Sequence, residues 1–534
     1  MAEYAGLRHV GGIGIMPTPE PLMRRTPLVL CLSFLCCFGA EVAWAGFDRQ
    51  ELTVPGSLLS ATYGDLDGDG RTDLLVAFRR GYGPRAERFL AVFFRSAAGY
   101  AEKPELIFPA PPDAAVYDVG DVLPAPGEEV VYLTGIGVYA QSLAGKKAGV
   151  PTRIVTQATV VGQGEEDDLQ PWDFAKSNLE RPLLIVPTRR ALELHRQEGE
   201  VWKRWADPKV DPFFYYDAES PNFRRSGRGG SPGRPFALRV TTVIPNLDLV
   251  DQNGDGLLDL VTHYEDRVSI HLGQATSGIA DKPTWQRWYQ TRTKEEMETR
   301  DSGASAELVD LDGDRILDLV LTKIGGGITT LKTKVMFHRG LATGGFEEQA
   351  TQTFEDQGFA ALARYEDADG DGQLEMLQPF SEVSIVSMSR ALLQSKIDLE
   401  VRIRRRSTEK GQFFAPKPVQ ALDTSFGMDL SVGAALRGTA PLFGHDFDGD
   451  GQRDVILSQG GEEMQLLRGR PAGSAEPFEE EGKFTLRCSG TNTTSVLPAG
   501  KAGGGPDILV YYVARRDLAG KLVVFVNRFA PRNP

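Results

Sequence analysis

Acidic residues recur in this chain at a spacing that suits the binding of a hard metal ion. Five nine-residue segments carry a carboxylate, or in one case an amide, at positions 1, 3, 5 and 9; they begin at Asp65, Asp251, Asp310, Asp367 and Asp446. Alternate side chains of a tight loop converge on one point, and four anions brought together repel one another unless a cation lies among them. Calcium suits such a site because it accepts roughly six to eight oxygen ligands in flexible geometry. We therefore predict five calcium-binding loops.

The predicted ligand set includes position 7, whose side chain varies freely, as expected if only its backbone carbonyl is used. Position 6 is glycine in four loops, which suits a turn with positive φ, and Arg315 in the third loop, which we expect to be strained or weaker. The predicted metal ligands are Asp65, Asp67, Asp69, Arg71, Asp73, Asp251, Asn253, Asp255, Leu257, Asp259, Asp310, Asp312, Asp314, Ile316, Asp318, Asp367, Asp369, Asp371, Gln373, Glu375, Asp446, Asp448, Asp450, Gln452 and Asp454.

Spacing separates these loops from better-known calcium loops. An EF-hand needs a glutamate at position 12 and flanking helices, and dockerin-like loops also need an acid there. Tandem nonapeptide arrays need a repeat every nine residues, whereas these copies lie far apart. The residues at position 12 are Val76, Thr262, Leu321, Gln378 and Leu457.

The five loops resemble the FG-GAP repeat, also called the VCBS repeat, of integrin α-chains and bacterial secreted β-propellers. In that family the D-x-D-x-D-G-x-x-D loop joins two strands of a blade and holds calcium. The resemblance covers the mature chain at the level of the repeat, and it is specific in the five loops. It implies an all-β fold with structural calcium ions between strands.

An apolar strand follows each loop, as in Leu74–Ala77, and a second strand follows the first, as in Phe89–Phe94. Strong β-formers punctuated by glycine and proline predict strand-turn-strand units throughout, with one short helix at Ser389–Lys396. Strand-containing repeats that begin at intervals of tens of residues are typical of a propeller or a solenoid. We expect an eight-bladed β-propeller, or seven blades if one unit is an elaboration, closed by pairing of Glu51–Val54 with C-terminal strands. The units begin at about residues 65, 118, 173, 251, 310, 367, 446 and 497.

Three of the eight units lack the full acidic loop. One has Tyr117–Asp121 before the strand Glu129–Leu133, and the next has Trp172–Phe174. The last unit keeps its strands, including Pro506–Tyr511, and has lost the acids. We predict no calcium at these three.

The composition is that of ordinary globular material, with 41% hydrophobic and 25% charged residues and a formal net charge of −14. This negative charge argues against nucleic acid as a partner. The predicted ligands include 19 of the 73 acidic residues, so the acidity belongs mostly to the loops and not to a polyanionic surface.

Residues 1–45 have the pattern of a signal peptide with a leader. Arg24 and Arg25 precede the apolar run Leu28–Phe38, and Ala43–Ala45 gives a small-x-small cleavage pattern. The run is too short for an ordinary transmembrane helix, and the true start could be Met23. We expect an exported protein, periplasmic, cell-surface or extracellular, whose residues 46–534 form one propeller with no transmembrane segment. Cleavage would leave Cys488 as the sole cysteine, so no disulfide could form within the mature chain. We expect bound calcium to stabilise the fold instead.

Two intervals between units are longer than the others and predict insertions near residues 205–240 and 385–435. The first includes Phe213–Tyr216 and the arginine-rich Arg224–Arg234, and the second includes Arg402–Arg406. Long loops on a rigid scaffold often carry function. Aromatic residues there could stack on sugar rings and arginines could engage acidic groups, although a solvated loop would have the same composition.

The sequence contains no recognisable catalytic constellation. Gly229–Gly233 matches a G-x-S-x-G motif, but Pro232 removes the N–H that an oxyanion hole needs. We therefore expect a secreted, calcium-stabilised binding or interaction scaffold for a protein or glycan ligand, and not an enzyme. Two alternatives remain open. One is a carbohydrate-active enzyme, like a polysaccharide lyase or hydrolase, whose site we would seek near Arg402–Arg406 and Tyr215; the other is an integrin-like adhesin.

Overall fold

A computed structural model describes residues 46–81, 86–161, 169–210, 213–219, 237–299, 302–327, 330–360, 363–429, 435–460, 463–479, 484–487, 493–500, 504–512 and 518–529. The predicted signal peptide (residues 1–45), the possible start at Met23, the Arg224–Arg234 run and Cys488 lie outside these residues. In the part of the chain that the structure describes, no helix is long and apolar enough to cross a membrane. The described chain is mostly β-strand, which confirms the predicted β fold.

Three four- or five-stranded sheets and one hairpin make up the first half of the described chain, and consecutive strands are mostly antiparallel neighbours. The strands are β2 (Ser57–Gly64), β3 (Asp73–Arg80), β4 (Glu87–Phe93) and β5 (Leu106–Pro109); β6 (Ala114–Gly120), β7 (Glu129–Thr134), β8 (Gly137–Gln141) and β9 (Thr152–Thr156), with β10 (Gln170–Pro171) beside β6; β11 (Ala175–Lys176), β12 (Leu183–Pro187), β13 (Leu192–Glu198) and β14 (Val201–Ala206); and the hairpin β15 (Phe213–Glu219) and β16 (Ala237–Val243).

The second half repeats the same antiparallel order. Its strands are β17 (Asn246–Val250), β18 (Asp259–Tyr264), β19 (Arg267–His271) and β22 (Trp285–Trp288); β23 (Ser302–Val309), β24 (Asp318–Gly325), β25 (Lys332–His338) and β28 (Gln352–Gln357); β29 (Phe359–Ala360), β30 (Arg364–Glu366), β31 (Glu375–Ser381), β32 (Lys396–Arg404), β33 (Gln420–Asp429) and β34 (Ala435–Arg437); β35 (Leu442–His445), β36 (Asp454–Gln459), β37 (Glu463–Leu467) and β38 (Phe484–Arg487); β39 (Thr493–Leu497), β40 (Asp507–Tyr511), β41 (Lys521–Asn527) and β1 (Phe47–Thr53); and the short hairpins β20 (Gly273–Gln274) with β21 (Gly278–Ile279) and β26 (Gly340–Leu341) with β27 (Gly345–Phe346).

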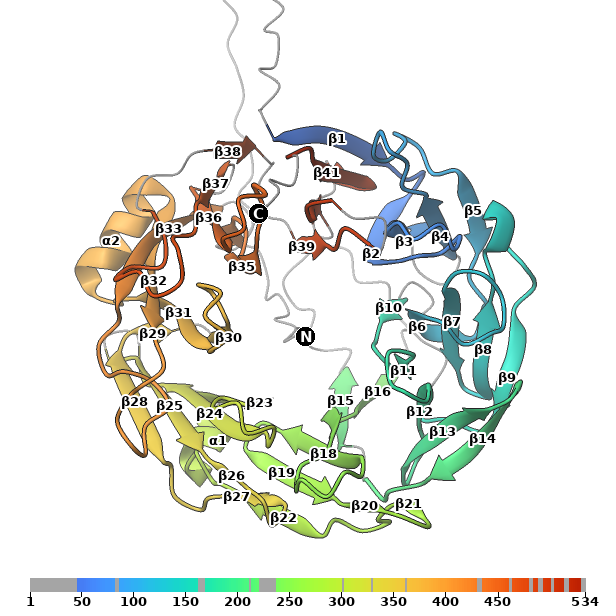
Figure 1. Cartoon of the computed structure of the whole chain (residues 1–534), viewed down its shortest axis with the longest axis horizontal. Helices are drawn as coiled ribbons and strands as arrows, with labels where there is room; N and C mark the ends of the chain where they lie inside the picture. The colour runs from blue at the N-terminus through green and yellow to red at the C-terminus, as the bar shows by residue number, and fades with distance from the viewer. Residues whose placement is uncertain are drawn as a thin grey trace, which may run out of the picture.

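The sheet that contains β29–β38 is formally ten-stranded, yet it consists of two antiparallel groups. One parallel pairing, Ser425 with Gln459, joins β33 to β36. Figure 1 shows the sheets following one another in chain order around a ring.

The core lies between consecutive sheets, which explains the continuous apolar runs after each loop. In β3, Leu74 and Val76 pack in one cluster with Leu522 of β41, whereas Leu75 and Ala77 pack in another cluster with residues of β7. Alternate side chains of a strand point to opposite faces, so a strand with both faces covered is apolar at every position.

The first and last described strands pair, as the sequence predicts. β1 is antiparallel to β41, with Glu51 opposite Val523 and Leu52 opposite Leu522. A largely buried ion pair adds a second link, between the β2–β5 sheet and the last sheet: Arg95, which follows β4, donates from Nε and Nη2 to the two carboxylate oxygens of Asp507 on β40, at 2.9 and 3.0 Å. The last sheet is therefore built from both ends of the chain.

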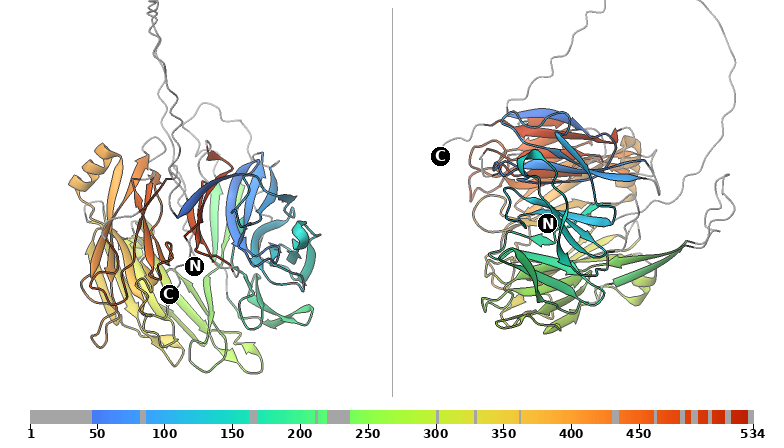
Figure 2. Two further views of the ribbon diagram at one scale, coloured as in Figure 1. Left: turned by 45° about the horizontal axis from the view of Figure 1, so that its top comes forward. Right: turned by 90° about the vertical axis from the view of Figure 1, so that its right-hand side faces the viewer.

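The two predicted insertions have different structures. The first contains the hairpin β15–β16, in which Phe213 lies opposite Val243, and Figure 2 shows it projecting from the other sheets. The second contains helix α2 (Ile385–Gln394) and the long strands β32 and β33. A capping box of Ser384 and Ser387 starts α2, so the helix begins earlier than the predicted Ser389–Lys396. A short helix α1 (Lys294–Thr299) was not predicted.

Candidate metal centres

Each acidic loop joins the first strand of a sheet to the second. The first loop runs from the end of β2 to Asp73, the first residue of β3. The position-9 acids of the other loops are likewise the first residues of β18, β24, β31 and β36. The loops therefore occupy the same place in five sheets.

The loop backbone turns through two residues with positive φ. In the first loop these are Gly68 at position 4, with φ of 80°, and Gly70 at position 6, with φ of 83°. In the third loop position 6 is Arg315, whose φ is 73°. A side chain with a Cβ is strained in this region, so the predicted strain at Arg315 is confirmed. Position 4 is glycine in all five loops, a requirement of the turn that was not predicted.

Position 1 holds the turn by accepting backbone hydrogen bonds. The carboxylate of Asp65 accepts from the N–H of Gly68 at 2.9 Å and from that of Gly70 at 3.0 Å. In the fifth loop Asp446 accepts from Gly449 at 2.7 Å and from Gly451 at 2.8 Å. Position 1 is thereby oriented toward the inside of the loop.

Position 5 supports the exit from the turn. Its carboxylate accepts from the N–H of position 7, as Asp69 does from Arg71 at 2.9 Å and Asp450 from Gln452 at 2.9 Å. The side chain of Arg71 also pairs with Asp69, Nη1 to Oδ2, at 2.7 Å. Gln373 likewise donates to Asp371, at 3.3 Å, whereas the apolar Leu257 and Ile316 at position 7 cannot make this bond.

Position 9 ties the loop to the end of the third strand. Asp73 accepts from the N–H of Leu66 at 3.0 Å and from that of Arg95, just beyond β4, at 2.8 Å. Asp454 makes the equivalent bonds with Phe447 and Gly469, both at 2.9 Å. One carboxylate thus connects three segments of the sheet in the first, second, third and fifth loops, whereas Glu375 in the fourth accepts from Ala368 at 2.8 Å.

Burial makes these position-9 carboxylates costly to ionise. It raises the pKa of Asp73, Asp318, Glu375 and Asp454 to about 7; nearby loop carboxylates add to the rise, and backbone hydrogen bonds oppose it. A nearby cation favours the charged form of a carboxylate. A metal ion bound in the loop would therefore lower the cost of ionising the position-9 carboxylate.

Four loops bring three carboxylates together, with oxygens that all lie within 4.8 Å of one another. In the second loop, which has Asn253 at position 3, no three acidic side chains of the described residues lie this close. The position-5 acids of the first, third and fifth loops stand outside these groups. The groups are Asp65, Asp67 and Asp73; Asp310, Asp312 and Asp318; Asp367, Asp369 and Asp371; and Asp446, Asp448 and Asp454.

The residues fit a hard divalent cation. All the converging donors are carboxylate oxygens, the ligand type that calcium and magnesium prefer. In addition, Oδ1 of Asp312 and Oδ1 of Asp367 are buried without a hydrogen-bond partner. A buried polar atom normally has a partner, and a bound ion would supply one. The four clusters could therefore hold metal ions.

The units without a full loop use their remaining acids differently. Asp118 accepts from the N–H groups of Phe174 and Ala175, both at 2.8 Å, and so joins β6 to the next sheet. Glu129, the first residue of β7, accepts from Val122 and Leu123, both at 2.9 Å. Glu129 thus occupies the position-9 site of a sheet without the loop.

The prediction that the last unit has lost its acids is wrong at one residue. Asp507 is the first residue of β40 and accepts from the N–H of Asn527 at 2.8 Å, in the manner of position 9. Its charge is balanced by Arg95. This role could not be read from the sequence, because the other acids of the loop are absent.

The arginines proposed for an alternative enzyme site are engaged within the protein. Arg402 pairs with Asp356 at 2.8 Å and with Glu400 at 2.6 Å, and Arg405 pairs with Asp369 at 2.7 Å. The side chain of Tyr215, on the projecting hairpin, is outside the described part. The structure therefore does not bring Arg402 and Arg405 to a free ligand-facing surface.

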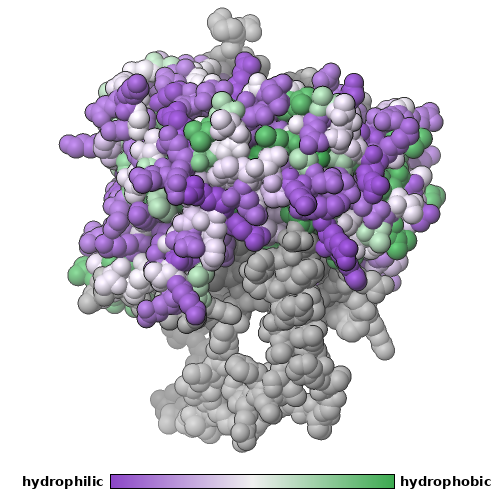
Figure 3. Space-filling model, turned by 90° about the horizontal axis from the view of Figure 1, so that it is seen from below, coloured by the Kyte–Doolittle hydropathy of each residue, from purple (hydrophilic) through white to green (hydrophobic). Residues whose placement is uncertain are grey.

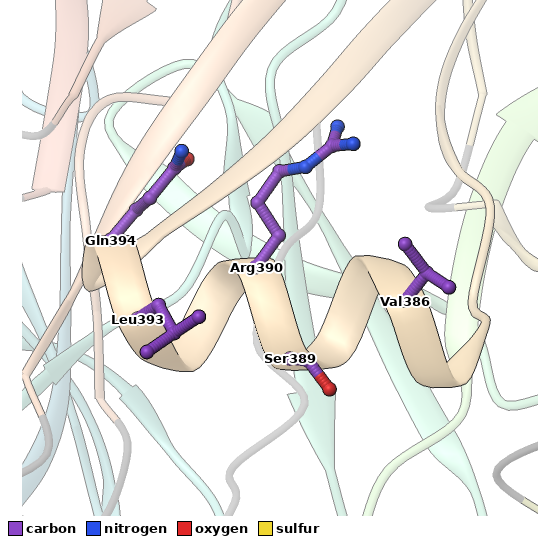
Figure 4. Close-up of a pocket in the computed structure, with 5 residues that line it drawn as sticks. All are labelled: Val386, Ser389, Arg390, Leu393 and Gln394. Atoms are coloured by element: carbon purple, nitrogen blue, oxygen red, sulfur yellow. The ribbon is translucent and has the colours of Figure 1, made fainter.

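The surface of helix α2 has a small hollow, shown in Figure 4. Its lining residues are Val386, Ser389, Arg390, Leu393 and Gln394, with Arg390 and Gln394 extending to one side of the helix and Ser389 to the other. This hollow contains no acid or histidine, so it offers no acid–base pair for catalysis.

Comparisons with known proteins do not extend these findings. No model of a protein family matches the chain, and no curated protein matches it. Among solved structures, the chain is similar to a lectin from Agrocybe aegerita that recognises non-reducing terminal N-acetylglucosamine, with a TM-score of 0.33 and 13% identity over 83% of this chain and 89% of that chain.

Two further solved structures show the same level of similarity. Sqt1 from Chaetomium thermophilum has a TM-score of 0.39 and 10% identity over 88% of this chain and 95% of that chain. The V. cholerae biofilm matrix protein Bap1 has a TM-score of 0.31 and 10% identity over 89% of this chain and 88% of that chain. At these scores none of the three carries an argument about function.

Proposed function

We propose that the protein is an exported β-propeller that binds structural calcium and serves as a scaffold for a protein or glycan ligand rather than as an enzyme. The observation that carries the proposal is the recurrence of one loop geometry at the same place in five sheets, with converging carboxylates in four of them. Export rests on the signal-peptide pattern of residues 1–45.

Eight blades account for the strand pairing better than seven. Apart from β10, β29, β34 and the three hairpins, the strands group as β2–β5, β6–β9, β11–β14, β17–β19 with β22, β23–β25 with β28, β30–β33, β35–β38, and β39–β41 with β1. Each group has four strands, the usual number in a propeller blade. We propose that each is one blade.

Calcium would act on the fold and not on a substrate. Positions 1, 3 and 9 would hold the ion in the first, third and fifth loops, and positions 1, 3 and 5 in the fourth. The bound ion would neutralise carboxylates whose own hydrogen bonds reach the first and second strands and the end of the third. Removal of the ion would destabilise the loop first and then the strands that the loop joins.

Thermal unfolding in calcium and in EDTA tests the structural role. We expect a lower melting temperature in EDTA, because an ion present at 100 times its Kd and bound only to the folded state contributes about 2.7 kcal/mol per site. Asp67→Ala and Asp448→Ala should each reduce this calcium-dependent part. Asp173→Ala, in a unit without the loop, is the matched control. Equal melting of the unaltered protein in both conditions would contradict the proposal.

The scaffold role is supported by what the surface offers. The face shown in Figure 3 is mainly hydrophilic, with hydrophobic residues in small separate groups. The projecting β15–β16 hairpin carries the aromatic run Phe213–Tyr216. An aromatic run on a projecting hairpin suits recognition of a glycan or protein surface better than catalysis in a cleft.

A binding screen tests the scaffold role. Because Phe213 and Val243 are paired, the hairpin can be replaced by a short glycine–serine link with little strain on the body. We expect the unaltered protein to bind a member of a glycan and polysaccharide panel in calcium, and the variant without the hairpin to lose this binding at an unchanged melting temperature. Turnover of a panel member would instead establish an enzyme.

A further inference from the structure

The position-3 carboxylate contacts a basic side chain in each of the four loops that have an aspartate there. Lys146 Nζ lies 3.0 Å from Oδ2 of Asp67, and Arg405 Nη2 lies 2.7 Å from Oδ2 of Asp369. The remaining two pairs are Arg339 with Asp312 and Arg468 with Asp448. These four cations are called the loop counter-ions below.

Three loop counter-ions occupy one structural position. Arg339, Arg405 and Arg468 each come directly after the third-strand residue that pairs with position 10 of the loop. In the first loop this position is Phe94, because Phe93 is the residue that pairs with Leu74. There Lys146 comes from the next sheet, lies over the Phe94 ring at 4.6 Å, and reaches Asp67. The cation that contacts the position-3 carboxylate therefore follows the third strand of the same sheet in three loops and comes from the next sheet in the first loop.

The second loop lacks both charges. Its position 3 is Asn253, and the residue in the counter-ion position is Leu272, directly after the partner of Leu260. Both side chains lie against Gly344 of the next sheet, within 4 Å of where its Cβ would be. The negative charge at position 3 and the positive charge beside it are therefore present together or absent together.

Burial explains why a counter-ion is needed. The side chains of Asp448 and Asp369 are 0% and 1% exposed, and those of Asp67 and Asp312 are 6% and 11% exposed. An ionised carboxylate at such depth is unfavourable unless it is paired. In the metal-free protein the loop counter-ion supplies that pairing. When a divalent ion binds to the same carboxylate, the counter-ion repels it.

We infer that the loop counter-ions hold the loops together without metal and set an upper limit on their metal affinity. This inference rests on the proposed calcium binding. It assigns Lys146, Arg339, Arg405 and Arg468 a regulatory role at sites to which they contribute no ligand atom. The second loop has no such limit.

Two substitutions test the inference by calcium titration calorimetry and thermal unfolding of the purified full-length protein. Arg468→Met removes the counter-ion of the fifth loop, and Lys146→Met removes that of the first. Lys146 is 53% exposed, so its loss is the milder change for folding. We expect each variant to melt at a lower temperature in EDTA and to bind calcium at one site about tenfold more tightly.

Arg470→Met is the matched control. Arg470 lies two residues beyond Arg468 and pairs with Glu476 at 2.8 Å, away from the loop. Its removal should leave calcium affinity unchanged. An unchanged or weaker affinity in Lys146→Met would overturn the inference, because it would show that the cation orients the carboxylate for the metal or does not affect it.

The second loop provides the reverse experiment. Asn253→Asp should destabilise the protein in EDTA, because it adds a half-buried charge without a counter-ion beside Asp255, to which Asn253 Nδ2 donates at 3.0 Å. Adding Leu272→Arg should restore the melting temperature in EDTA and lower the calcium affinity gained by the first change. If the unaltered protein and all variants bind no calcium, the proposed function fails. If they bind it with equal affinity, only the counter-ion inference fails.

Discussion

Two neighbouring sheets treat the same buried carboxylate in different ways. Asp454 in β36 and Asp507 in β40 both open the second strand of their sheet, and both accept an N–H from just beyond the end of the third strand or from its last residue. Around Asp454 two more carboxylates converge. Asp507 instead has a fixed guanidinium, that of Arg95. Both acids are buried, and Arg95 compensates Asp507 permanently, whereas the proposed metal ion would compensate Asp454 exchangeably.

The ion pair between Asp507 and Arg95 should make the largest single contribution to the free energy of unfolding. Replacing Asp507 by alanine removes the partner of Arg95, whose side chain is only 12% exposed, and loss of one partner of a largely buried pair typically costs about 3 to 5 kcal/mol. Urea unfolding should show this loss equally in calcium and in EDTA. Asp398→Ala, which breaks the exposed pair with Lys396 at 3.2 Å, is the control and should change stability by less than about 1 kcal/mol. A loss at Asp507 that depends on calcium would remove the distinction between the two sheets.

The contribution of Asp454 to stability should depend on calcium, whereas that of Asp507 should not. Asp454→Asn keeps a hydrogen-bond acceptor but removes the charge, so in calcium it should reduce the free energy of unfolding by about 2.7 kcal/mol, the contribution of one saturated site. In EDTA at pH 8 the loss should be smaller, because removal of a buried ionised group partly offsets the loss of the backbone hydrogen bond that the asparagine Nδ2 cannot accept. Equal losses in both conditions would mean that Asp454 serves only the backbone.

The sheet β6–β9 keeps a buried acid, Glu129, at the same place, but among the described residues it has neither a converging acidic loop nor an arginine partner. The stability of the protein should therefore depend on the protonation of Glu129 and on pH. Burial raises the pKa of Glu129 to about 7. A carboxylate with a raised pKa in the folded state favours folding below its unfolded pKa, and this advantage is lost as the pH rises through about 7. Relative to Glu129→Gln, the unaltered protein should therefore lose about 2 kcal/mol between pH 5 and pH 8. A parallel pH dependence of the two proteins, measured in urea, would contradict this.

The smallest effect concerns the turn and separates backbone strain from metal binding. Arg315→Gly should stabilise the protein by about 1 kcal/mol, since glycine adopts positive φ without strain. Gly372 is the equivalent residue of the fourth loop, and a Cβ there would meet no atom within 4 Å. Gly372→Arg should therefore destabilise by a similar amount in EDTA. Unequal magnitudes would indicate that the third loop is adapted to its arginine.

Local features of this fold could be predicted from the sequence because their causes are local. The acids at positions 1 and 5 bond to backbone groups within five residues, so the nine-residue pattern contains the whole turn. The apolar runs indicated buried strands for the same reason. The pairing of β1 with β41 was predictable because a repeat that closes on itself must join its ends.

The rest depends on register, which the sequence pattern does not show. Arg339 is 27 residues from Asp312, and Arg405 is 36 residues from Asp369; only the pairing of the second and third strands brings them together. Asp507 lacks the neighbouring acids that would have marked it. The arginine run Arg402–Arg406 suggested a ligand surface, but Arg402 on β32 pairs with Asp356 and Arg405 just beyond it pairs with Asp369, both within the protein.

The final sheet also determines when the protein can finish folding. Its outer strand, β1, is synthesised first, and its partner β41 is synthesised last. Contacts between residues so distant in sequence form slowly, because a long chain must be closed before they contribute. Until the last strand emerges, β1 presents an unpaired edge to its surroundings. Chains truncated by even the last strand should therefore expose this edge and associate with one another through it.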